Sequence, residues 1–406
     1  MLARSIGLAM CVVVLGMTLP AAGEEKFWAR HAVDNSSRKG GGADGVRLAD
    51  VNGDGLPDIT TGWEEEGEIR VYLNPGPAKS AQPWPATTVA KVKSPEDAVF
   101  VDLDGDGAVD VVSSTEGKNR TIYVHWAPKE KQKYLDASAW TTAPLPATQK
   151  LEQWMYALPF DVDGQHGIDL IVGSKNKGSV SWLESPANPR DLASWKLHKI
   201  VDAGWIMSLF SRDIDGNGVP DVLVSDRSGP HQGVYWLENL GKGSFKPRPI
   251  GGSTTSCKFL DAGDFRGRGK KSTDIVVAAP EGILGFFGEP SETWTPFTIP
   301  GRFSKAVAVG DVDLDGRLDI VYTNGEGKKT PEFHGAGWVS FEGDFGTGKP
   351  TIHNLSGPEG IKYDRIELID LDGDGDLDVL TCEEEVGARH EGLGVIWYEN
   401  PTRQRR

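Results

Sequence analysis

The 406-residue sequence predicts an all-β fold, a seven-bladed β-propeller of four-stranded blades. First, an aspartate- and glycine-rich phrase recurs seven times at intervals of 47–59 residues, which is the length of one propeller blade. Second, each copy lies between two short apolar runs and is followed by an aromatic run and an outer run. Third, glycine (51) and proline (25) are frequent and long helical periodicity is absent, as expected for short strands joined by turns.

Residues 1–23 precede the repeats and have the pattern of a secretory signal peptide. Arg4 supplies a positive charge, "IGLAMCVVVLGMTL" an apolar stretch, and "AAG" small residues before Glu24. The apolar stretch is shorter than the ~20 residues that a membrane-spanning helix needs. We therefore expect no transmembrane segment, a secreted or periplasmic, extracytoplasmic location, and a single propeller over residues 24–406.

The overall charge argues against a polyanionic partner. The formal net charge is −16, and it becomes −17 without Arg4. Proteins that bind nucleic acid normally carry a net positive charge, so we expect no nucleic-acid partner. Separately, we expect a monomer. Beyond the signal segment the chain has only Cys257 and Cys382, which excludes a disulfide-built scaffold and leaves open whether these two pair.

The repeated phrase marks one turn in each blade. The seven copies are "DVNGDGLPD" at 50, "DLDGDGAVD" at 102, "DVDGQHGID" at 161, "DIDGNGVPD" at 213, "DFRGRGKKSTD" at 264, "DVDLDGRLD" at 311 and "DLDGDGDLD" at 370. An apolar run such as "AVAVG" (306–310) precedes each copy, and one such as "DIVYT" (319–323) follows it. We name the four strands of a blade A to D from the axis outward, which places the phrase in the A–B loop.

The outer strands show how the ring closes. A run such as "WKLHKIV" (195–201) occurs six times inside the chain, but the seventh unit ends at "WYENPTRQRR" without one. The missing copy is "FWARHAV" at residues 27–33. We expect this N-terminal strand to complete the last blade, which removes the open sheet edges that an unclosed array would leave.

The phrase "DxDGDGxxD" between two apolar strands, repeated in seven blades, resembles the FG-GAP/VCBS-repeat propellers, which are related to the integrin α-chain head. The resemblance covers nearly all of residues 24–406. It implies a propeller with calcium-binding A–B hairpin loops. It implies little about the ligand, because this family is functionally diverse.

The aspartates of the phrase suit calcium. Side chains at positions 1, 3, 5 and 9 and the carbonyl of position 7 are hard oxygen ligands, and glycine at position 6 permits the sharp turn. Five loops carry a complete set of ligands: Asp50, Asn52, Asp54 and Asp58; Asp102, Asp104, Asp106 and Asp110; Asp213, Asp215, Asn217 and Asp221; Asp311, Asp313, Asp315 and Asp319; and Asp370, Asp372, Asp374 and Asp378. We expect about five structural Ca²⁺ ions.

Two loops depart from the pattern. The third offers Asp161, Asp163 and Asp169, but His166 replaces the turn glycine, so its occupancy is open. In the fifth, Arg266 and Arg268 stand where ligands should be. We expect no calcium there and interpret the two arginines as internal counter-charges.

The B–C and D–A loops must share the face opposite the calcium loops, because neighbouring strands run antiparallel. Their charged and aromatic side chains should converge on a central funnel. The candidate ligand-binding residues are Trp63, Glu64, Glu116, Lys118, Trp154, Lys175, Asp226, Arg227, Lys362, Tyr363, Arg365 and Glu383. Such a mixture of acids, bases and aromatic rings suits a carbohydrate or cell-surface polymer, which makes a ligand-binding module the favoured function.

An enzyme acting on sugars is the alternative. Elimination from a sugar needs a base and a cation that holds the developing enolate, whereas hydrolysis needs two carboxylates. The candidate catalytic residues are Lys362, Asp364, Arg365, Glu383, Glu384 and Glu64. The chain has no "GxSxG" motif and no metalloprotease helix motif. Whether the protein is catalytic, and on which ligand it acts, stays open at this stage.

Overall fold

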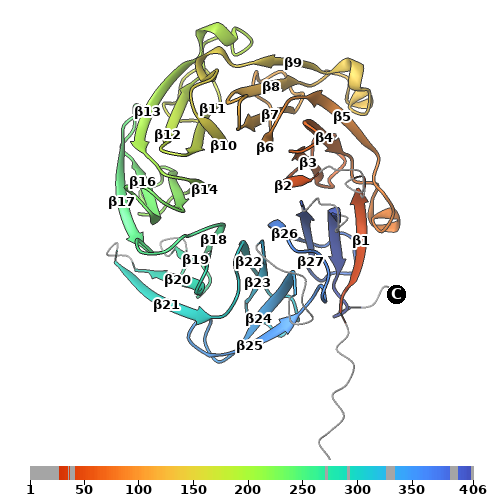
Figure 1. The fold of residues 1–406 in the computed structure, drawn as a ribbon, viewed down its shortest axis with the longest axis vertical. Helices are drawn as coiled ribbons and strands as arrows, with labels where there is room; N and C mark the ends of the chain where they lie inside the picture. The colour runs from red at the N-terminus through yellow and green to blue at the C-terminus, as the bar shows by residue number, and fades with distance from the viewer. Residues whose placement is uncertain are drawn as a thin grey trace, which may run out of the picture.

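The predicted seven-bladed propeller is confirmed by a computed structural model, which describes residues 27–34, 36, 42–269, 273–289, 293–325, 334–384 and 392–403. These residues form seven four-stranded antiparallel sheets arranged around a central opening (Figure 1). The predicted signal peptide lies outside the described residues. Within the described ranges, no helix has the length and apolar character needed to cross a bilayer.

The blades follow one another along the chain, and six of them run from strand A to strand D in sequence order. The first three blades are β2 (Ala43–Ala49), β3 (Asp58–Trp63), β4 (Glu68–Tyr72) and β5 (Ala86–Lys91); β6 (Pro95–Val101), β7 (Asp110–Thr115), β8 (Ile122–Trp126) and β9 (Thr141–Pro144); and β10 (Gln153–Phe160), β11 (Asp169–Lys175), β12 (Ser179–Glu184) and β13 (Lys196–Asp202). The next three are β14 (Ile206–Arg212), β15 (Asp221–Asp226), β16 (Gly233–Asn239) and β17 (Phe245–Gly251); β18 (Leu260–Gly263), β19 (Asp274–Ala279), β20 (Gly282–Gly288) and β21 (Trp294–Pro300); and β22 (Ala306–Gly310), β23 (Asp319–Thr323), β24 (Ala336–Glu342) and β25 (Lys349–Asn354). The seventh contains β26 (Tyr363–Ile369), β27 (Asp378–Glu383), β28 (Gly394–Glu399) and β1 (Ala29–Asp34). Short 3₁₀ turns lie in the connections: η2 (Pro77–Lys79), η3 (Lys131–Lys133), η4 (Ala137–Ala139), η5 (Pro146–Thr148) and η6 (Leu192–Ser194).

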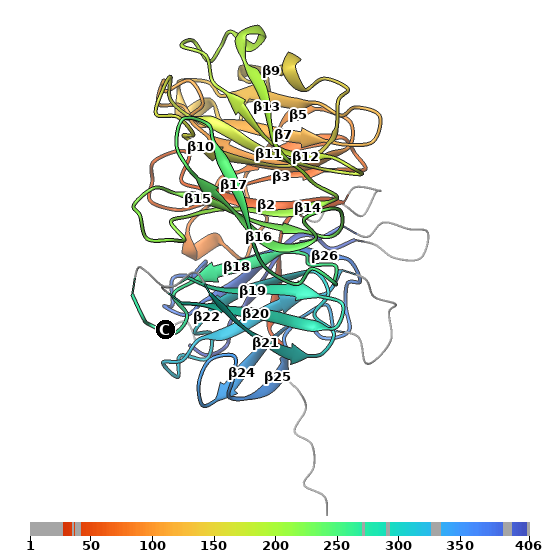
Figure 2. The same ribbon diagram turned by 90° about the vertical axis from the view of Figure 1, so that its left-hand side faces the viewer.

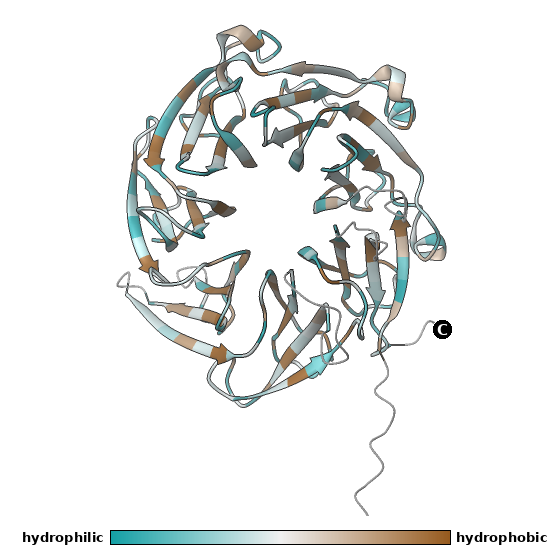
Figure 3. Cartoon of the chain, in the orientation of Figure 1, coloured by the Kyte–Doolittle hydropathy of each residue, from teal (hydrophilic) through white to brown (hydrophobic). Residues whose placement is uncertain are grey.

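The core lies between neighbouring sheets. Every B strand is buried throughout, apart from the last residue of β11, because both of its faces pack against other blades. The outer strands, such as β13 and β25, are largely exposed. Figure 3 shows hydrophobic and hydrophilic segments alternating within the blades, and Figure 2 shows the same ring from its side. The C-strand tryptophans Trp126, Trp182, Trp236 and Trp397 are all buried.

The N-terminal strand closes the ring as predicted. β1 is the outermost strand of the seventh blade and pairs antiparallel with β28, from Ala29 opposite Glu399 to Asp34 opposite Val395. In Figure 1 the red strand β1 therefore lies beside the blue strands of the C-terminus. Its flanks also reach both neighbouring blades, through backbone hydrogen bonds from Trp28 to Leu355 (3.0 Å) and from Trp84 to Val33 (3.1 Å).

The two cysteines do not pair. Cys257 and Cys382 are both buried and free. Cys257 packs among apolar residues of the fourth and fifth blades, whereas Cys382 packs among those of the first and seventh. Both thiols therefore serve as small core side chains, and burial raises the pKa of Cys257 to about 12.

Candidate functional site

The ninth residue of the A–B loop is an aspartate that ties five of the loops to their blades. Asp221 is fully buried at the start of β15, and its two carboxylate oxygens accept N–H groups from Ile214 (3.0 Å) and Asn239 (2.8 Å). A similar pair of bonds joins the loop to a residue just after the C strand at Asp58, Asp110, Asp169 and Asp378. Burial raises the pKa of Asp221 to about 6. This position therefore organises the blade.

The loop carboxylates fit a hard cation. In the second, third and fourth loops, one oxygen from each of positions 1, 3 and 9 lies within 4.8 Å of the others. That spacing is about twice the ~2.4 Å distance between Ca²⁺ and a ligand oxygen. In the fourth loop, Asp213 Oδ1 is buried without a hydrogen-bond partner among the described residues. In the second loop, Arg190 from the third blade pairs with Asp104 and Asp106, so the chain itself supplies part of the charge that balances these carboxylates.

The two atypical loops keep the fold in different ways. In the third, His166 adopts the left-handed conformation (φ +63°) that glycine would otherwise provide, and Asp161, Asp163 and Asp169 still converge. In the fifth, the Arg266 guanidinium lies against the buried Asp274, with N–H···O distances of 2.7 to 3.1 Å.

At the opposite end of the ring, side chains from several blades enclose a cavity of ≈ 300 Å³, which we call the funnel cavity. Two sequence registers supply most of its lining. The first set, which we call the strand ring, takes from each blade the residue six positions before the first aspartate of its A–B loop: Asp44, Glu96, Met155, Met207, Lys258, Lys305 and Asp364. The second set, which we call the loop ring, takes from each blade the residue six positions after the final aspartate of the repeated A–B loop sequence: Glu64, Glu116, Lys175, Arg227, Pro280, Gly325 and Glu384. Asp364 and Pro280 are the two members that do not line the cavity, whereas Tyr156, Trp205 and Lys362 add to its lining.

Charge is separated around these rings. The seventh, first and second blades contribute only acids, which we call the acidic arc: Asp364, Glu384, Asp44, Glu64, Glu96 and Glu116. The third to sixth blades contribute methionines and the basic arc, which comprises Lys175, Arg227, Lys258 and Lys305. Between them, the Arg227 guanidinium stacks 4.2 Å from the Trp205 ring, and Lys175 Nζ lies 4.9 Å from the same ring.

Lysines pair with both ends of the acidic arc. At one end, Lys305 Nζ lies 2.7 Å from Asp364 Oδ2 and 3.4 Å from Glu384 Oε1, and Lys362 Nζ lies 3.1 Å from Glu384 Oε2. At the other end, Lys175 contacts Glu116 and lies 3.1 Å from Glu96 Oε1. All of these ion pairs face the same cavity or its wall.

Crowding shifts the protonation of this cluster. Burial, together with the carboxylates of Glu384 and Asp364, raises the pKa of Asp44 well above its ordinary range. Burial and the Glu96 carboxylate raise the pKa of Glu64 to about 7. Burial opposes the charged form of Lys305, but Asp364 and Glu384 outweigh it and raise its pKa well above the ordinary value. Lys305 is therefore held as a cation.

The structure brings several predicted ligand-binding and catalytic candidates together in the funnel cavity. Its lining includes Glu64, Glu116, Lys175, Arg227, Lys362 and Glu384. Asp364 lies behind the lining, 1% exposed, in contact with Lys305. Lys118 is exposed on its B–C loop, outside the cavity.

The three aromatic candidates are core residues, which corrects their predicted place in the funnel. Trp63 and Trp154 are 0% exposed and donate Nε1–H to the Tyr72 hydroxyl (2.9 Å) and to a backbone carbonyl (3.1 Å). Tyr363 is also 0% exposed, and its hydroxyl is hydrogen-bonded to that of Tyr398 (2.6 Å). Their rings fill space between blades and present no surface to a ligand.

Two acidic candidates serve the backbone instead of the cavity. Glu383 is 0% exposed and its carboxylate accepts three backbone N–H groups at 2.9–3.1 Å. Asp226 is 0% exposed and accepts backbone N–H groups at 2.7–3.1 Å. Both carboxylates thus fix the loop conformations that present their neighbours, Glu384 and Arg227.

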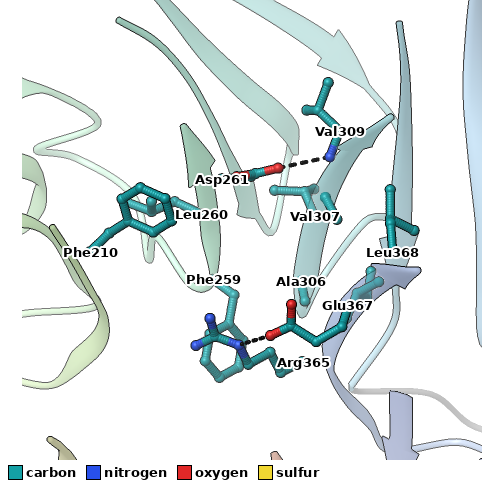
Figure 4. Close-up of a pocket in the computed structure, with 12 residues that line it drawn as sticks. Phe210, Phe259, Leu260, Asp261, Ala306, Val307, Val309, Arg365, Glu367 and Leu368 are labelled. Carbon is teal, nitrogen blue, oxygen red and sulfur yellow. Dashed lines mark hydrogen bonds and ion pairs between the residues drawn. The ribbon is translucent and has the colours of Figure 1, made fainter. Parts of the chain in front are cut away.

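Arg365 also lies away from the funnel cavity. It lines a separate pocket of ≈ 220 Å³ between the inner strands of the fourth to seventh blades, where its Nε lies 3.1 Å from Glu367 Oε1 (Figure 4). On the neighbouring first blade, Arg47 makes two hydrogen bonds to Asp97 (2.9 and 3.0 Å). Charged side chains on these inner strands are therefore held in ion pairs.

Sequence reasoning missed Asp44 and left the two rings unrecognised. The sequence nevertheless contains the register that identifies them. Counting six residues back from the first aspartate, and six forward from the final one, gives the funnel residues of every blade. The regular rise of the A and B strands makes this count hold at every position except Asp364 and Pro280, which do not line the cavity.

Comparison with known proteins agrees with the fold and the repeat. The family model described as the FG-GAP-like repeat matches residues 50–113 and 213–277, so this propeller carries FG-GAP-like repeats. No curated protein matches the chain in sequence. Among solved structures, the fold is similar to a streptogramin B lyase (13% identity, TM-score 0.51, covering 88% of this chain and 92% of the other) and to a chain of a mitotic checkpoint complex (11%, 0.50, 98% and 99%). At these identities the likeness shows the fold alone.

Proposed function

We propose that this propeller with FG-GAP-like repeats is an exported, calcium-stabilised binding module that holds an acidic carbohydrate in the funnel cavity. The observation that carries the proposal is the charge separation of the two rings that line most of the cavity, with acids on three neighbouring blades and bases on the other four. FG-GAP repeats are typical of extracellular proteins, which agrees with the pattern of residues 1–23.

An acidic sugar matches both halves of this lining. Its carboxylate would pair with the basic arc, where Arg227 can form two parallel, charge-assisted hydrogen bonds. Its hydroxyl groups would donate to carboxylates such as Glu64 on the acidic arc. The indole of Trp205, which also lines the cavity, supplies apolar surface beside them.

Binding tests this proposal directly. Calcium-loaded protein is screened against oligosaccharides that contain uronic acids and against their neutral counterparts. We expect preference for the acidic set, and at least about a tenfold loss of affinity in Arg227→Met, because a hydrogen bond to a charged group contributes about 1.5–3 kcal/mol. Arg248→Met, on the outer strand β17, is the matched control and should bind normally. Equal binding of acidic and neutral sugars, or equal binding by the two variants, would contradict the proposal.

The same screen of sugars also tests the alternative that the protein is an enzyme. Glu384 raises the pKa of Lys362 against the effect of burial, so this lysine is suited to hold a developing enolate as a cation and not to act as a base. In that case a funnel carboxylate would have to take the proton. Growth of the ultraviolet absorbance of a new conjugated double bond, abolished in Lys362→Ala, would establish a lyase in place of a binding module.

Calcium in the A–B loops is the second part of the proposal. Positions 1, 3, 5 and 9 would hold the ion, which would neutralise the clustered carboxylates and stabilise the folded state by mass action, by about 2.7 kcal/mol at a concentration a hundredfold above Kd. The converging oxygens and the buried, unpartnered Asp213 Oδ1 support this fit.

Two substitutions in the fourth loop separate the metal from the fold. Asp215→Asn should reduce the stabilisation by calcium and leave the chelated protein unchanged, because among the described residues the Asp215 carboxylate bonds only within its own loop. Asp221→Asn should also destabilise the chelated protein, by about 1–3 kcal/mol, because a buried backbone N–H loses its acceptor. Thermal unfolding with excess calcium and with EGTA measures both. A melting temperature of the wild type that EGTA does not lower would refute the role of calcium.

A further inference from the structure

A second cavity adjoins the basic side of the funnel. It has a volume of ≈ 410 Å³ and is lined by three short segments, residues 176–178, 202–204 and 228–230. The first and third segments belong to the B–C loops of the third and fourth blades, and the second joins these two blades. This cavity, which we call the side groove, therefore opens at the same end of the ring as the funnel cavity.

A thin wall separates the side groove from the funnel cavity. Lys175, Trp205 and Arg227 line the funnel cavity, and a sequence neighbour of each lines the side groove. These neighbours are Asn176, Gly204 and Ser228. The backbone joins the wall together, because the Arg227 N–H donates to the Trp205 carbonyl (2.8 Å) and Lys175 lies opposite Trp205 in a β-bridge. A ligand longer than the funnel cavity therefore meets the side groove next.

One buried carboxylate holds both sides of this wall. Asp226 accepts the N–H groups of Gly204 (3.0 Å), Trp205 (2.7 Å) and Ser228 (3.1 Å). Trp205 faces the funnel cavity, whereas Gly204 and Ser228 face the side groove. The two cavities are thus fixed relative to each other before any ligand binds, which lowers the entropic cost of holding one ligand in both.

Lys177 gives the side groove an ammonium group. It is exposed, lines the groove and forms no ion pair with any residue that the structure describes. Asp202, an acid that also lines the groove, pairs instead with Lys199 (2.7 Å). Lys177 has φ +65° directly after Asn176 at +63°, a left-handed turn position that favours glycine. The positive charge therefore stands where the turn itself would be better served by glycine.

We infer that the side groove is a second sugar subsite, so that the ligand is an acidic oligosaccharide chain and not a single sugar. This inference rests on the proposed function and deepens it. The funnel cavity of ≈ 300 Å³ is at the lower limit of the ~300–1,000 Å³ typical of small-ligand sites, and the side groove adds ≈ 410 Å³ beside it. The sugar unit next to the one in the funnel occupies the groove. Its acid group pairs with Lys177, and its hydroxyl groups donate to Asp202.

The dependence of affinity on chain length tests this subsite. The uronic acid that binds best in the sugar screen is compared as a single unit, a dimer and a trimer, with the neutral sugar of each length in parallel. The proteins are the wild type, Lys177→Gly, Ser228→Tyr and the control Lys150→Gly. Lys150 is also exposed and left-handed (φ +58°) but lies outside both cavities, so its substitution makes the same change of charge and backbone.

We expect the wild type and Lys150→Gly to bind the acidic dimer at least about tenfold more tightly than the single unit, because the second unit adds a charge-assisted hydrogen bond. Lys177→Gly should weaken dimer binding by about three- to tenfold, although glycine relieves the turn and leaves the fold intact. Ser228→Tyr, which fills the groove, should remove the gain from the second unit.

The same measurements can overturn the inference. Equal affinity for one and two acidic units, or a gain that Lys177→Gly leaves unchanged, would mean that the groove holds no part of the ligand's charge. The two failures are distinguishable. If single acidic units bind better than neutral ones but a second unit adds nothing, the proposed function stands and the subsite does not. If acidic and neutral single units bind equally, the proposed function itself fails.

Discussion

Replacing Arg266 by alanine should lower the free energy of unfolding, because the fifth A–B loop relies on this arginine as a counter-charge. In the fifth blade the Arg266 guanidinium lies 2.7 Å from Asp274 Oδ1, and Asp274 is 1% exposed. The arginine side chain is itself only 16% exposed and stacks 4.4 Å from the Phe287 ring. Removing one partner of a buried ion pair costs about 3–5 kcal/mol, because the remaining charge is left without compensation.

Arg268 provides the matched control within the same loop. It is 50% exposed and pairs with Glu289 at 2.7 Å, so Arg268→Ala should cost only about 0–1 kcal/mol. The free energy of unfolding is measured by urea denaturation in EGTA, so that the proposed calcium sites of the other loops do not contribute. Adding Asp274→Asn to Arg266→Ala should restore part of the loss, since it removes the unpaired charge. If the two arginine variants differed by less than about 1 kcal/mol, the counter-charge interpretation would be wrong.

Three further predictions concern stability. Burial lowers the pKa of His125 to about 3 from 6.5, so between these pH values the unfolded chain binds a proton that the folded chain does not bind. The free energy of unfolding therefore carries no penalty from His125 above pH 6.5, and it falls by about 1.4 kcal/mol per pH unit from there towards pH 3. Urea unfolding at pH 7 and pH 5 should show the wild type losing about 2 kcal/mol more than His125→Gln, and equal losses would count against this explanation. Deleting residues 27–34 removes β1 and bares the edge of β28, so gel filtration should detect self-association; a monomer with an unchanged melting temperature would rule out the closing role. Lys305→Met leaves Asp364 and Glu384 without their shared cation and should cost about 3–5 kcal/mol, with partial recovery on adding Asp364→Asn; no loss would show that these acids are protonated.

The fold could be predicted because the same A–B loop sequence recurs in every blade. Each A–B loop needs an acidic turn followed by a buried aspartate, so the phrase marks the same corner of every blade. The closing strand followed from counting outer strands, and the structure places it at Ala29–Asp34, against an expected 27–33. Boundaries shifted by one or two residues because a tryptophan precedes several outer strands without joining the ladder, as Trp195 does before β13.

The funnel was predicted in the right place but with a register error. Trp63, Asp226 and Glu383 each stand one residue before a member of the loop ring, and Trp154 and Tyr363 stand one residue before a member of the strand ring. Successive side chains on a strand point to opposite sides, so a slip of one residue exchanges a cavity position for a core position. Local composition favours the wrong member of each pair, because a tryptophan beside a loop resembles a ligand-stacking residue. The exposed fractions of the two consecutive residues in the structure show which of them faces the cavity and which lies in the core.

Like charges are crowded at both ends of this ring, and the described residues show how the chain compensates them. Arg266 stands against Asp274 in the fifth loop, and Arg190 reaches two acids of the second. At the funnel, Lys305 plays the same part between Asp364 and Glu384. A built-in cation is permanent, whereas carboxylates left without one make a site whose charge depends on what is bound. Where an arginine or lysine already pairs with the acids, as Arg266 does with Asp274, the chain itself supplies part of the neutralising charge. The aspartates of the fourth loop are a place where an external cation has most to contribute.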